Sequence, residues 1–279
     1  MNRLEFKQNF LAALSPLYDE LECVAIFRLY VKEKLKIPYY QFCLEMMQSL
    51  PEHIHYDDDL KRLSHGEPIQ YVLGRTIFYD LVFKTDARVL IPRAETEELV
   101  GWVLQNNDVM GRLLDIGTGS GAIAVSLAHR WRNTDVFAID ISSDALELAR
   151  ENAELNGVTI DFAQMDILQD NINLPSFDLI ISNPPYVPER DKKDLCTNVI
   201  DYEPYTALFV PDSNPLLFYD AIAKFASKHL NNNGKLYFET YQSFHSELVQ
   251  MLSDYGFCQI KSRNDFAGKP RFISALWES

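Results

Sequence analysis

The 279-residue chain lacks the long apolar runs, the dense cysteine pattern and the excess of positive charge that mark several large classes of protein. Its apolar stretches are broken by charge well short of the roughly 18 residues of a membrane-spanning helix, as Arg28 breaks Cys23–Val31. Residues 1–10 carry three charged side chains and no apolar core segment, which argues against a secretory signal. We therefore expect neither a membrane span nor secretion.

Cysteine is scarce, and its spacing suits neither a metal site nor a disulfide framework. The four positions are Cys23, Cys43, Cys196 and Cys258. His53 and His55 lie two residues apart with no third ligand at a suitable spacing, so loop histidines are a better interpretation than metal ligands. The sequence predicts reduced thiols, a cytoplasmic location and no metal.

Basic residues are fewer than acidic ones, and the difference is distributed unevenly along the chain. The net formal charge is −14. Residues 1–75 carry 9 Lys and Arg against 11 Asp and Glu, a net of −2, which leaves −12 for residues 76–279. So acidic a region repels a phosphate backbone. Nucleic acid is therefore disfavoured as the main substrate, and a protein or a small molecule fits better.

Glycine is absent before Gly66. Apolar side chains in residues 1–66 recur at helical spacing, over 6–14, 17–29, 40–50 and 57–63. These stripes predict a compact helical-bundle domain that offers no catalytic pattern of its own. Residues 67–93 follow as a bridge, in which 70–74 and 76–84 have the β-rich, turn-punctuated character of a hairpin.

From residue 94 to residue 279, strands and helices alternate as they do in an α/β domain. We expect strands at 113–116, 135–139, 159–162, 178–182 and 235–239, and helices at 94–105, 122–130, 144–156, 216–229 and 243–255. The last two expected strands, 257–262 and 271–277, are too close for a crossover helix, so they must pair antiparallel. That arrangement is unlike the two-half dinucleotide fold and favours a methyltransferase topology.

A glycine-rich loop follows the first of these strands. Gly117, Gly119 and Gly121 stand at alternate positions, where glycine allows a tight turn and lets the backbone approach a nucleoside at a helix N-terminus. Asp140, roughly 20 residues further on, is placed to hold ribose hydroxyls. The loop fits either NAD or S-adenosylmethionine, and a purely structural glycine turn is a third interpretation.

The tetrapeptide Asn183-Pro184-Pro185-Tyr186 favours one of these readings. Its prolines stiffen the exit from the apolar run 177–182 and hold the neighbouring polar groups in fixed directions. The Asn183 side-chain oxygen and the Pro184 carbonyl can each accept one N–H of a planar NH2 group, which orients the nitrogen. Tyr186 offers a ring face to a flat substrate. Alone the motif fits a surface turn, but together with the glycine loop it indicates methyl transfer.

These stretches together resemble the HemK family, the peptide chain release factor glutamine N5-methyltransferases. The resemblance covers roughly three quarters of the chain and rests on 68–74, 90–97, the glycine loop, Asp140, the tetrapeptide and Glu203-Pro204. Because adenine-N6 DNA methyltransferases share the tetrapeptide, residues 70–74 and Pro92-Arg93 carry the assignment to this family.

The resemblance implies a Rossmann-like class I S-adenosylmethionine-dependent methyltransferase domain at 94–279. Its sheet would be seven-stranded and mostly parallel, with an antiparallel last strand, after the helical domain at 1–66 and the hairpin bridge at 67–93. The family's usual target is the glutamine in the Gly-Gly-Gln loop of bacterial class I release factors. A single loop of one protein needs contacts away from the reacting amide, so we expect the helical domain to dock the release factor.

The resemblance also implies roles for particular residues. The positions that would bind S-adenosylmethionine are Gly117, Thr118, Gly119, Ser120, Gly121, Asp140, Asp166, Ile167 and Asn183. The substrate amide would contact Asn183, Pro184, Pro185 and Tyr186, of which Asn183, Pro184 and Tyr186 would act in catalysis. Two positions depart from the family pattern. Ala94 stands where a second proline is usual, and Ile167 stands where an aromatic ring often stacks on adenine.

Two other functions compete with this interpretation. A nucleic-acid adenine N6-methyltransferase would need an added basic recognition region, which the sequence does not show. A non-catalytic cofactor-binding or assembly protein is disfavoured by the intact glycine loop and Asn183. A sulfonium methyl group is already an activated electrophile, so the favoured chemistry requires neither a nucleophilic side chain nor a metal.

Overall fold

The computed structural model describes residues 1–51, 56–108, 111–170 and 172–278, so His53 and His55 lie outside the described residues. The described chain separates into two compact units. The helical unit comprises residues 1–75 and 196–202, and the sheet unit comprises residues 76–195 and 203–279. The helical unit thus runs past the expected boundary at 66 to residue 75, and it also takes in a short segment from late in the chain.

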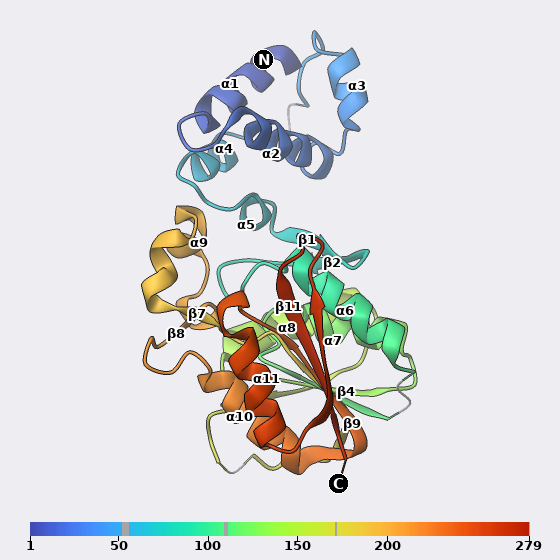
Figure 1. Ribbon diagram of the computed structural model, residues 1–279. Coiled ribbons are helices and arrows are strands. Elements are labelled where there is room, and N and C mark those ends of the chain that lie inside the picture. The colour runs from blue at the N-terminus through green and yellow to red at the C-terminus, as the bar shows by residue number, and fades with distance from the viewer. Residues whose placement is uncertain (52–55, 109–110, 171, 279) are drawn as a thin grey trace. The chain divides into compact units, whose positions relative to one another are not determined.

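The helical unit is built from α1 (Arg3–Leu14), α2 (Glu20–Glu33), α3 (Tyr39–Leu44), α4 (Asp57–Ser64), α5 (Ile69–Leu73) and α9 (Thr197–Tyr202) (Figure 1). Its core is aromatic. Phe6, Phe10, Phe27, Tyr30 and Phe42 are fully buried, and the rings of Phe10 and Phe27 meet edge to face with centroids 5.1 Å apart. Buried aromatic rings supply a large apolar area in few residues, which suits so small a unit.

Two expectations for the helical unit need correction. The helix expected at 40–50 ends at Leu44, because the chain beyond it hydrogen-bonds to the start of the protein: Arg3 N–H donates to the Gln48 carbonyl at 2.9 Å. The strand expected at 70–74 is instead the helix α5. Pro68 precedes it, and Gly74 closes it in the left-handed conformation at φ 67°. A short apolar run does not distinguish the two structures.

The hairpin predicted from 76–84 is present in the sheet unit. It pairs β1 (Arg75–Phe78) with β2 (Leu81–Lys84). Tyr79 and Asp80 make the turn with φ of 49° and 64°. Positive φ at both central residues gives the turn the twist that a two-residue hairpin needs.

A seven-stranded sheet forms the centre of the sheet unit, in the order β10-β11-β9-β6-β3-β4-β5. Its strands are β3 (Arg112–Ile116), β4 (Asp135–Asp140), β5 (Asp161–Gln164), β6 (Phe177–Ser182), β9 (Leu230–Glu239), β10 (Cys258–Asn264) and β11 (Pro270–Trp277). Strand β11 runs antiparallel to both of its neighbours, and β9, β6, β3, β4 and β5 pair parallel. The expected sheet, including its antiparallel last strand, is confirmed.

Helices cover both faces of this sheet (Figure 1). On one face lie α6 (Ala94–Asn106), α7 (Ala122–Arg130) and α8 (Ser143–Leu155), and on the other lie α10 (Leu217–His229) and α11 (His245–Asp254). Neighbouring strand residues serve opposite faces: Leu113 packs in the first core and Leu114 in the second. Burial on both faces explains why these strands read as continuous apolar runs.

Two element boundaries differ from the sequence prediction. Strand β9, expected from residue 235, already begins at Leu230, so Gly234 lies inside it, and the strand pairs irregularly with β6 over this stretch. A Cβ added at Gly234 would lie 2.8 Å from the Asn231 carbonyl oxygen, so glycine is required there for space. The helix expected from residue 144 begins at Ser143 instead, because Ser142 caps it: the Ser142 hydroxyl accepts from Ala145 N–H at 3.1 Å.

The chain between the tetrapeptide and α10 is made of short elements. Strand β7 (Val187–Pro188) pairs parallel with β8 (Phe209–Val210), and the 3-10 helices η1 (Glu189–Asp194) and η2 (Tyr205–Ala207) lie between them in sequence. A further 3-10 helix, η3 (Gln242–Phe244), precedes α11. Within the described ranges, no helix is long and apolar enough to span a bilayer.

Candidate active site

Four neighbouring strands end at one edge of the sheet. The parallel register sets Ile116 beside Ile139 on one side and Ser182 on the other, and sets Ser182 beside Phe238. The residues that come next along each strand are therefore close to one another. They are Gly117, Asp140, Asn183 and Glu239. Ligands of open α/β sheets bind at this carboxyl edge.

The glycine loop turns sharply from β3 into α7. Gly117, Gly119 and Gly121 have φ of 72°, 54° and 80°, a conformation that other residues rarely adopt. Gly117 N–H and Thr118 N–H both donate to the Ile139 carbonyl, at 2.9 and 3.1 Å, which fastens the loop to the end of β4. An added Cβ would meet nothing within 4 Å at Gly117 or Gly119, so the backbone there is open to a ligand.

Asp140 is held beside this loop by two backbone donors. Gly119 N–H donates to its Oδ2 and Ser142 N–H to its Oδ1, both at 2.9 Å. Burial raises the pKa of Asp140 above its ordinary value, and the backbone hydrogen bonds partly oppose that shift. A carboxylate has about four acceptor positions, so capacity remains for two ribose hydroxyls. This geometry suits the ribose role expected for Asp140.

Asp115 is a second carboxylate near the loop, and the sequence reasoning missed it. Its Oδ2 accepts from Thr118 Oγ1 at 2.7 Å and from Ala124 N–H at 3.2 Å. Its Oδ1 is buried, and none of the described residues hydrogen-bonds to it. Burial raises the pKa of Asp115 to about 7. A buried oxygen without a partner calls for a donor, which the amino group of a bound cofactor or an ordered water would supply.

The remaining positions expected to bind the cofactor lie around the same edge. The Ser120 carbonyl accepts from Asn152 Nδ2 at 2.9 Å, which ties the loop to α8. Met165 N–H donates to the Asp140 carbonyl at 2.9 Å, so Asp166 and Ile167 follow next to Asp140. Both side chains are half-buried. An adenosine cofactor thus fits the residues present: open glycine backbone, a carboxylate with free acceptor positions and an unpartnered buried oxygen.

Asn183 follows the last residue of β6, and the NH2 group of its side-chain amide already makes a hydrogen bond. Its Nδ2 donates to Thr96 Oγ1 at 3.1 Å. Among the residues that the structure describes, none donates a hydrogen bond to Asn183 Oδ1. Pro184 is buried, and Asn183, Pro185 and Tyr186 are half-buried. The arrangement leaves the amide oxygen as the group available to a ligand.

Tyr186 is fixed at both its ring and its hydroxyl. The ring stacks on Tyr241 with centroids 5.8 Å apart, and the hydroxyl donates to Glu239 Oε1 at 3.1 Å. Burial and the charge of Glu239 raise the pKa of Tyr186 far above its ordinary value. Tyr186 therefore stays a neutral hydroxyl and does not act as a base. Its packing against a substrate stays a prediction.

Thr96 and Glu239 complete this cluster, and neither was singled out from the sequence as a site residue. Thr96 Oγ1 donates to Glu239 Oε2 at 2.7 Å. Burial raises the pKa of Glu239, while hydrogen bonds from Thr96 and Tyr186 and the charge of Arg271 oppose the rise. One signal was available: Glu239 is an acid at the carboxyl end of an apolar strand.

The loop before α6 is tied to the residue after α9. Glu203 is buried; its Oε1 lies 2.5 Å from Arg93 Nη2, and its Oε2 accepts from Ile91 N–H at 3.2 Å. The hydrogen bonds of Glu203 thus join two stretches that are far apart in the sequence, residues 90–97 and Glu203-Pro204. The first of these stretches contains the start of the helix that carries Thr96.

This edge of the sheet has the architecture of a class I S-adenosylmethionine-dependent methyltransferase. The family model for the methyltransferase small domain matches residues 96–203. A methyltransferase from Pyrococcus furiosus shares the fold, with a TM-score of 0.53 and 18% identity over 71% of this chain and 90% of its own.

Two curated relatives narrow the class further. The release factor glutamine methyltransferase of Flavobacterium psychrophilum is 40% identical over 96% of both chains. That of Lactococcus lactis is 46% identical over 77% of this chain and 79% of its own. The chain belongs to the release factor glutamine methyltransferase family.

Replacing Asp140 tests the ribose assignment. Asp140→Ala should weaken binding of S-adenosylmethionine by about 10- to 150-fold, since a hydrogen bond to a charged group is worth roughly 1.5–3 kcal/mol. Asp140→Asn keeps an acceptor for Gly119 N–H, so its affinity for S-adenosylmethionine should lie between those of the wild type and Asp140→Ala. The measurement is the dissociation constant by calorimetry, with the exposed Asp161→Ala as the matched control. An unchanged constant for Asp140→Ala would refute the assignment.

Proposed function

We propose that the protein transfers a methyl group from S-adenosylmethionine to the side-chain N5 of the glutamine in the Gly-Gly-Gln loop of class I peptide chain release factors. One structural observation supports this most directly: Asn183 Nδ2 is held by Thr96 at 3.1 Å, so its oxygen is left to accept from a substrate amide. The names of the relatives point to the same substrate.

The chain's own residues bind and orient the glutamine amide. Asn183 Oδ1 and the Pro184 carbonyl each accept one of its N–H groups, which holds the nitrogen in line for attack. The amide lone pair is delocalised into its carbonyl, and two acceptors favour the positive charge that builds on nitrogen. When bound, S-adenosylmethionine supplies an already activated methyl group, so the residues need only position and stabilise.

The cluster offers no side-chain base for the departing proton. Glu239 is fully buried, and its two oxygens accept hydrogen bonds from Thr96 at 2.7 Å and from Tyr186 at 3.1 Å, so the carboxylate is shielded from solvent and engaged by the protein itself. The raised pKa of Tyr186 keeps its hydroxyl neutral. We therefore assign proton loss to a step after methyl transfer, with water or a carbonyl as the acceptor.

The proposal is tested by giving the protein a choice of substrates. Labelled S-adenosylmethionine is incubated with class I release factors and a DNA duplex in one reaction, and the methyl group is located by mass spectrometry. We expect the label on the Gly-Gly-Gln glutamine. Label on adenine would instead support the nucleic-acid N6-methyltransferase, which the net charge of −12 over residues 76–279 disfavours.

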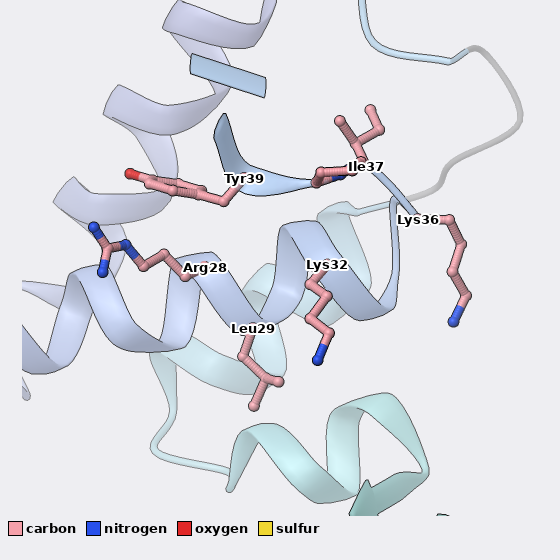
Figure 2. A pocket seen from close by; sticks show the side chains of 7 residues that line it. Arg28, Leu29, Lys32, Lys36, Ile37 and Tyr39 are labelled. Atoms are coloured by element: carbon pink, nitrogen blue, oxygen red, sulfur yellow. The ribbon is translucent and has the colours of Figure 1, made fainter. Parts of the chain in front are cut away.

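We also propose that the helical unit docks the release factor through a basic hollow on its surface. The hollow has a volume of about 590 Å³, and Figure 2 shows Arg28, Leu29 and Lys32 on α2 beside Ile37 and Tyr39 of the segment that follows. The Arg28 guanidinium lies 4.8 Å from the Tyr39 ring centroid. An exposed cation beside apolar surface suits an acidic segment of a partner protein.

Deleting the helical unit would be a poor test of docking. Residues 196–202 belong to this unit, and the Tyr202 hydroxyl donates to the His65 carbonyl at 3.0 Å. A chain without residues 1–75 would leave that segment with nothing to pack against. Substitutions in the full chain avoid this problem.

Charge reversal at the hollow should separate docking from chemistry. We expect Arg28→Glu with Lys32→Glu to raise KM for intact release factor about tenfold or more, since rim charges act on association. KM for a short Gly-Gly-Gln peptide should not change. Lys61→Glu with Lys228→Glu makes the same charge change at exposed positions elsewhere. An equal rise in this control would show a general charge effect and refute docking at the hollow.

A further inference from the structure

Four side chains at the site are linked by hydrogen bonds, although they come from three separate parts of the sequence. Asn183 Nδ2 donates to Thr96 Oγ1 at 3.1 Å, and Thr96 Oγ1 donates to Glu239 Oε2 at 2.7 Å. Tyr186 donates to the other carboxylate oxygen, Oε1, at 3.1 Å. This series of hydrogen bonds therefore runs from Asn183, the residue expected to hold the substrate, to the buried carboxylate of Glu239.

The chemistry of these groups gives this series of hydrogen bonds a direction. A carboxylate accepts hydrogen bonds and donates none. Thr96 has a single hydroxyl proton, which it donates in its hydrogen bond to Glu239. The Thr96 oxygen can then only accept from its other neighbour, and the only donor on the Asn183 side chain is the NH2 group. Asn183 is thereby held with Nδ2 toward Thr96 and Oδ1 turned away.

Glu239 is itself held in place. Tyr219 donates to its backbone carbonyl at 3.0 Å, and its two carboxylate oxygens are bonded by Thr96 and Tyr186. Its side chain is buried. A carboxylate fixed in this way imposes one orientation on the Thr96 hydroxyl.

We propose that Thr96 and Glu239 are positioning residues that determine which end of the Asn183 amide faces the substrate. This inference rests on the proposed role of Asn183 as an acceptor. The two ends of an amide have nearly the same shape, so packing alone does not choose between them. With the amide reversed, an NH2 group would face the NH2 group of the substrate, and neither could accept.

The first test removes the Thr96 hydroxyl and keeps the shape. Thr96→Val should lower kcat on release factor by about 10- to 100-fold, with KM and the dissociation constant of S-adenosylmethionine within about twofold of the wild type. Thr96→Ser restores the hydroxyl and should recover most of the lost kcat. Thr85→Val is the matched control, because Thr85 is buried and its hydroxyl has no hydrogen-bond partner among the residues that the structure describes. A wild-type kcat for Thr96→Val would overturn the proposal.

The second test asks whether Thr96 acts through Asn183. In the Asn183→Ala background, Thr96→Val should change kcat by no more than about twofold, because there is no amide left to orient. A full additional loss there would show that Thr96 acts by another route and would overturn the inference alone. Wild-type activity of Asn183→Ala itself would overturn the acceptor role as well, so the two failures are distinguishable.

Glu239→Gln provides an independent variant of the same series of hydrogen bonds. Glutamine has nearly the same shape but carries a donor as well as an acceptor, so the Thr96 proton is no longer forced in one direction. We expect kcat to fall while circular dichroism and thermal midpoint show a folded protein. A folded Glu239→Gln protein with wild-type kcat would contradict the role of Glu239.

Discussion

Asn183→Ala should lower the rate of methyl transfer by about 10²-fold or more while leaving the affinity for S-adenosylmethionine within a few fold. The expected loss is that of one preorganised group which stabilises charge in the transition state. Asn183 Oδ1 is free to accept because its Nδ2 is engaged by Thr96, so alanine removes the acceptor and little packing. The measurements are single-turnover methylation of a release factor and calorimetry of cofactor binding.

Asn214→Ala is the matched control, since Asn214 is exposed and lies outside the site. It should methylate release factor at the wild-type rate. Near-wild-type turnover by a folded Asn183→Ala protein would be incompatible with the mechanism proposed above. A large loss of cofactor affinity in that variant would instead assign Asn183 to cofactor binding.

Asp115→Asn should change how the stability of the sheet unit depends on pH. Asp115 is buried, its Oδ1 has no hydrogen-bond partner within the described part of the chain, and its pKa is raised to about 7. In the unfolded chain an aspartate ionises near pH ~3.9. Between these two values the folded protein binds more protons than the unfolded chain, so this group makes the fold less stable as pH rises. Asparagine removes that dependence.

The size of the effect follows from the shift. About three pKa units at roughly 1.36 kcal/mol per unit correspond to an upper value on the order of 4 kcal/mol. Asp115→Asn should therefore be more stable, relative to wild type, at pH 8 than at pH 4. Urea unfolding at both pH values can be followed by tryptophan fluorescence, because Trp102, Trp131 and Trp277 all lie in the sheet unit.

The exposed Asp161→Asn serves as the control for this experiment and should show the wild-type dependence. Asparagine at 115 still offers an oxygen to Thr118 Oγ1 and Ala124 N–H, so the local fold should survive. Parallel pH profiles for wild type and Asp115→Asn would show that Asp115 does not carry the predicted shift.

The sheet could be predicted because its strands leave strong local signals. Strand β6 is an apolar run that ends just before Asn183, and β3 is one that ends just before Gly117, so both strand ends were predicted correctly. The short element at 69–73 could not be assigned in the same way. A segment of five mostly apolar residues fits a strand or a helical turn equally well. In the structure it is helical, with Pro68 at its start and Gly74 in the left-handed conformation at its end.

The site was predictable only in part, for a related reason. The glycine loop, Asp140 and the tetrapeptide each have a local pattern, and the sheet register brings them together. Thr96 and Glu239 are 143 residues apart, and no local pattern pairs them, although Glu239 is an acid at the end of a strand and Thr96 lies in the stretch 90–97. Their contact depends on β9 lying beside β6 and on the start of α6 meeting the end of β9. The role of Asp115 could not be predicted either, because a single acid in an apolar strand does not indicate that one of its oxygens is buried without a hydrogen-bond partner among the described residues.

Residues 196–202 give the helical unit an order of assembly during synthesis. The ribosome makes residues 1–75 first, then the 120 residues from 76 to 195, and only then the segment that completes the unit. At about 5–20 residues per second, that interval lasts roughly 6–24 s. The helical unit therefore closes only after strands β1 to β6 have been synthesised. A nascent chain that stalls before residue 196 carries an unfinished helical unit, whatever the state of its sheet.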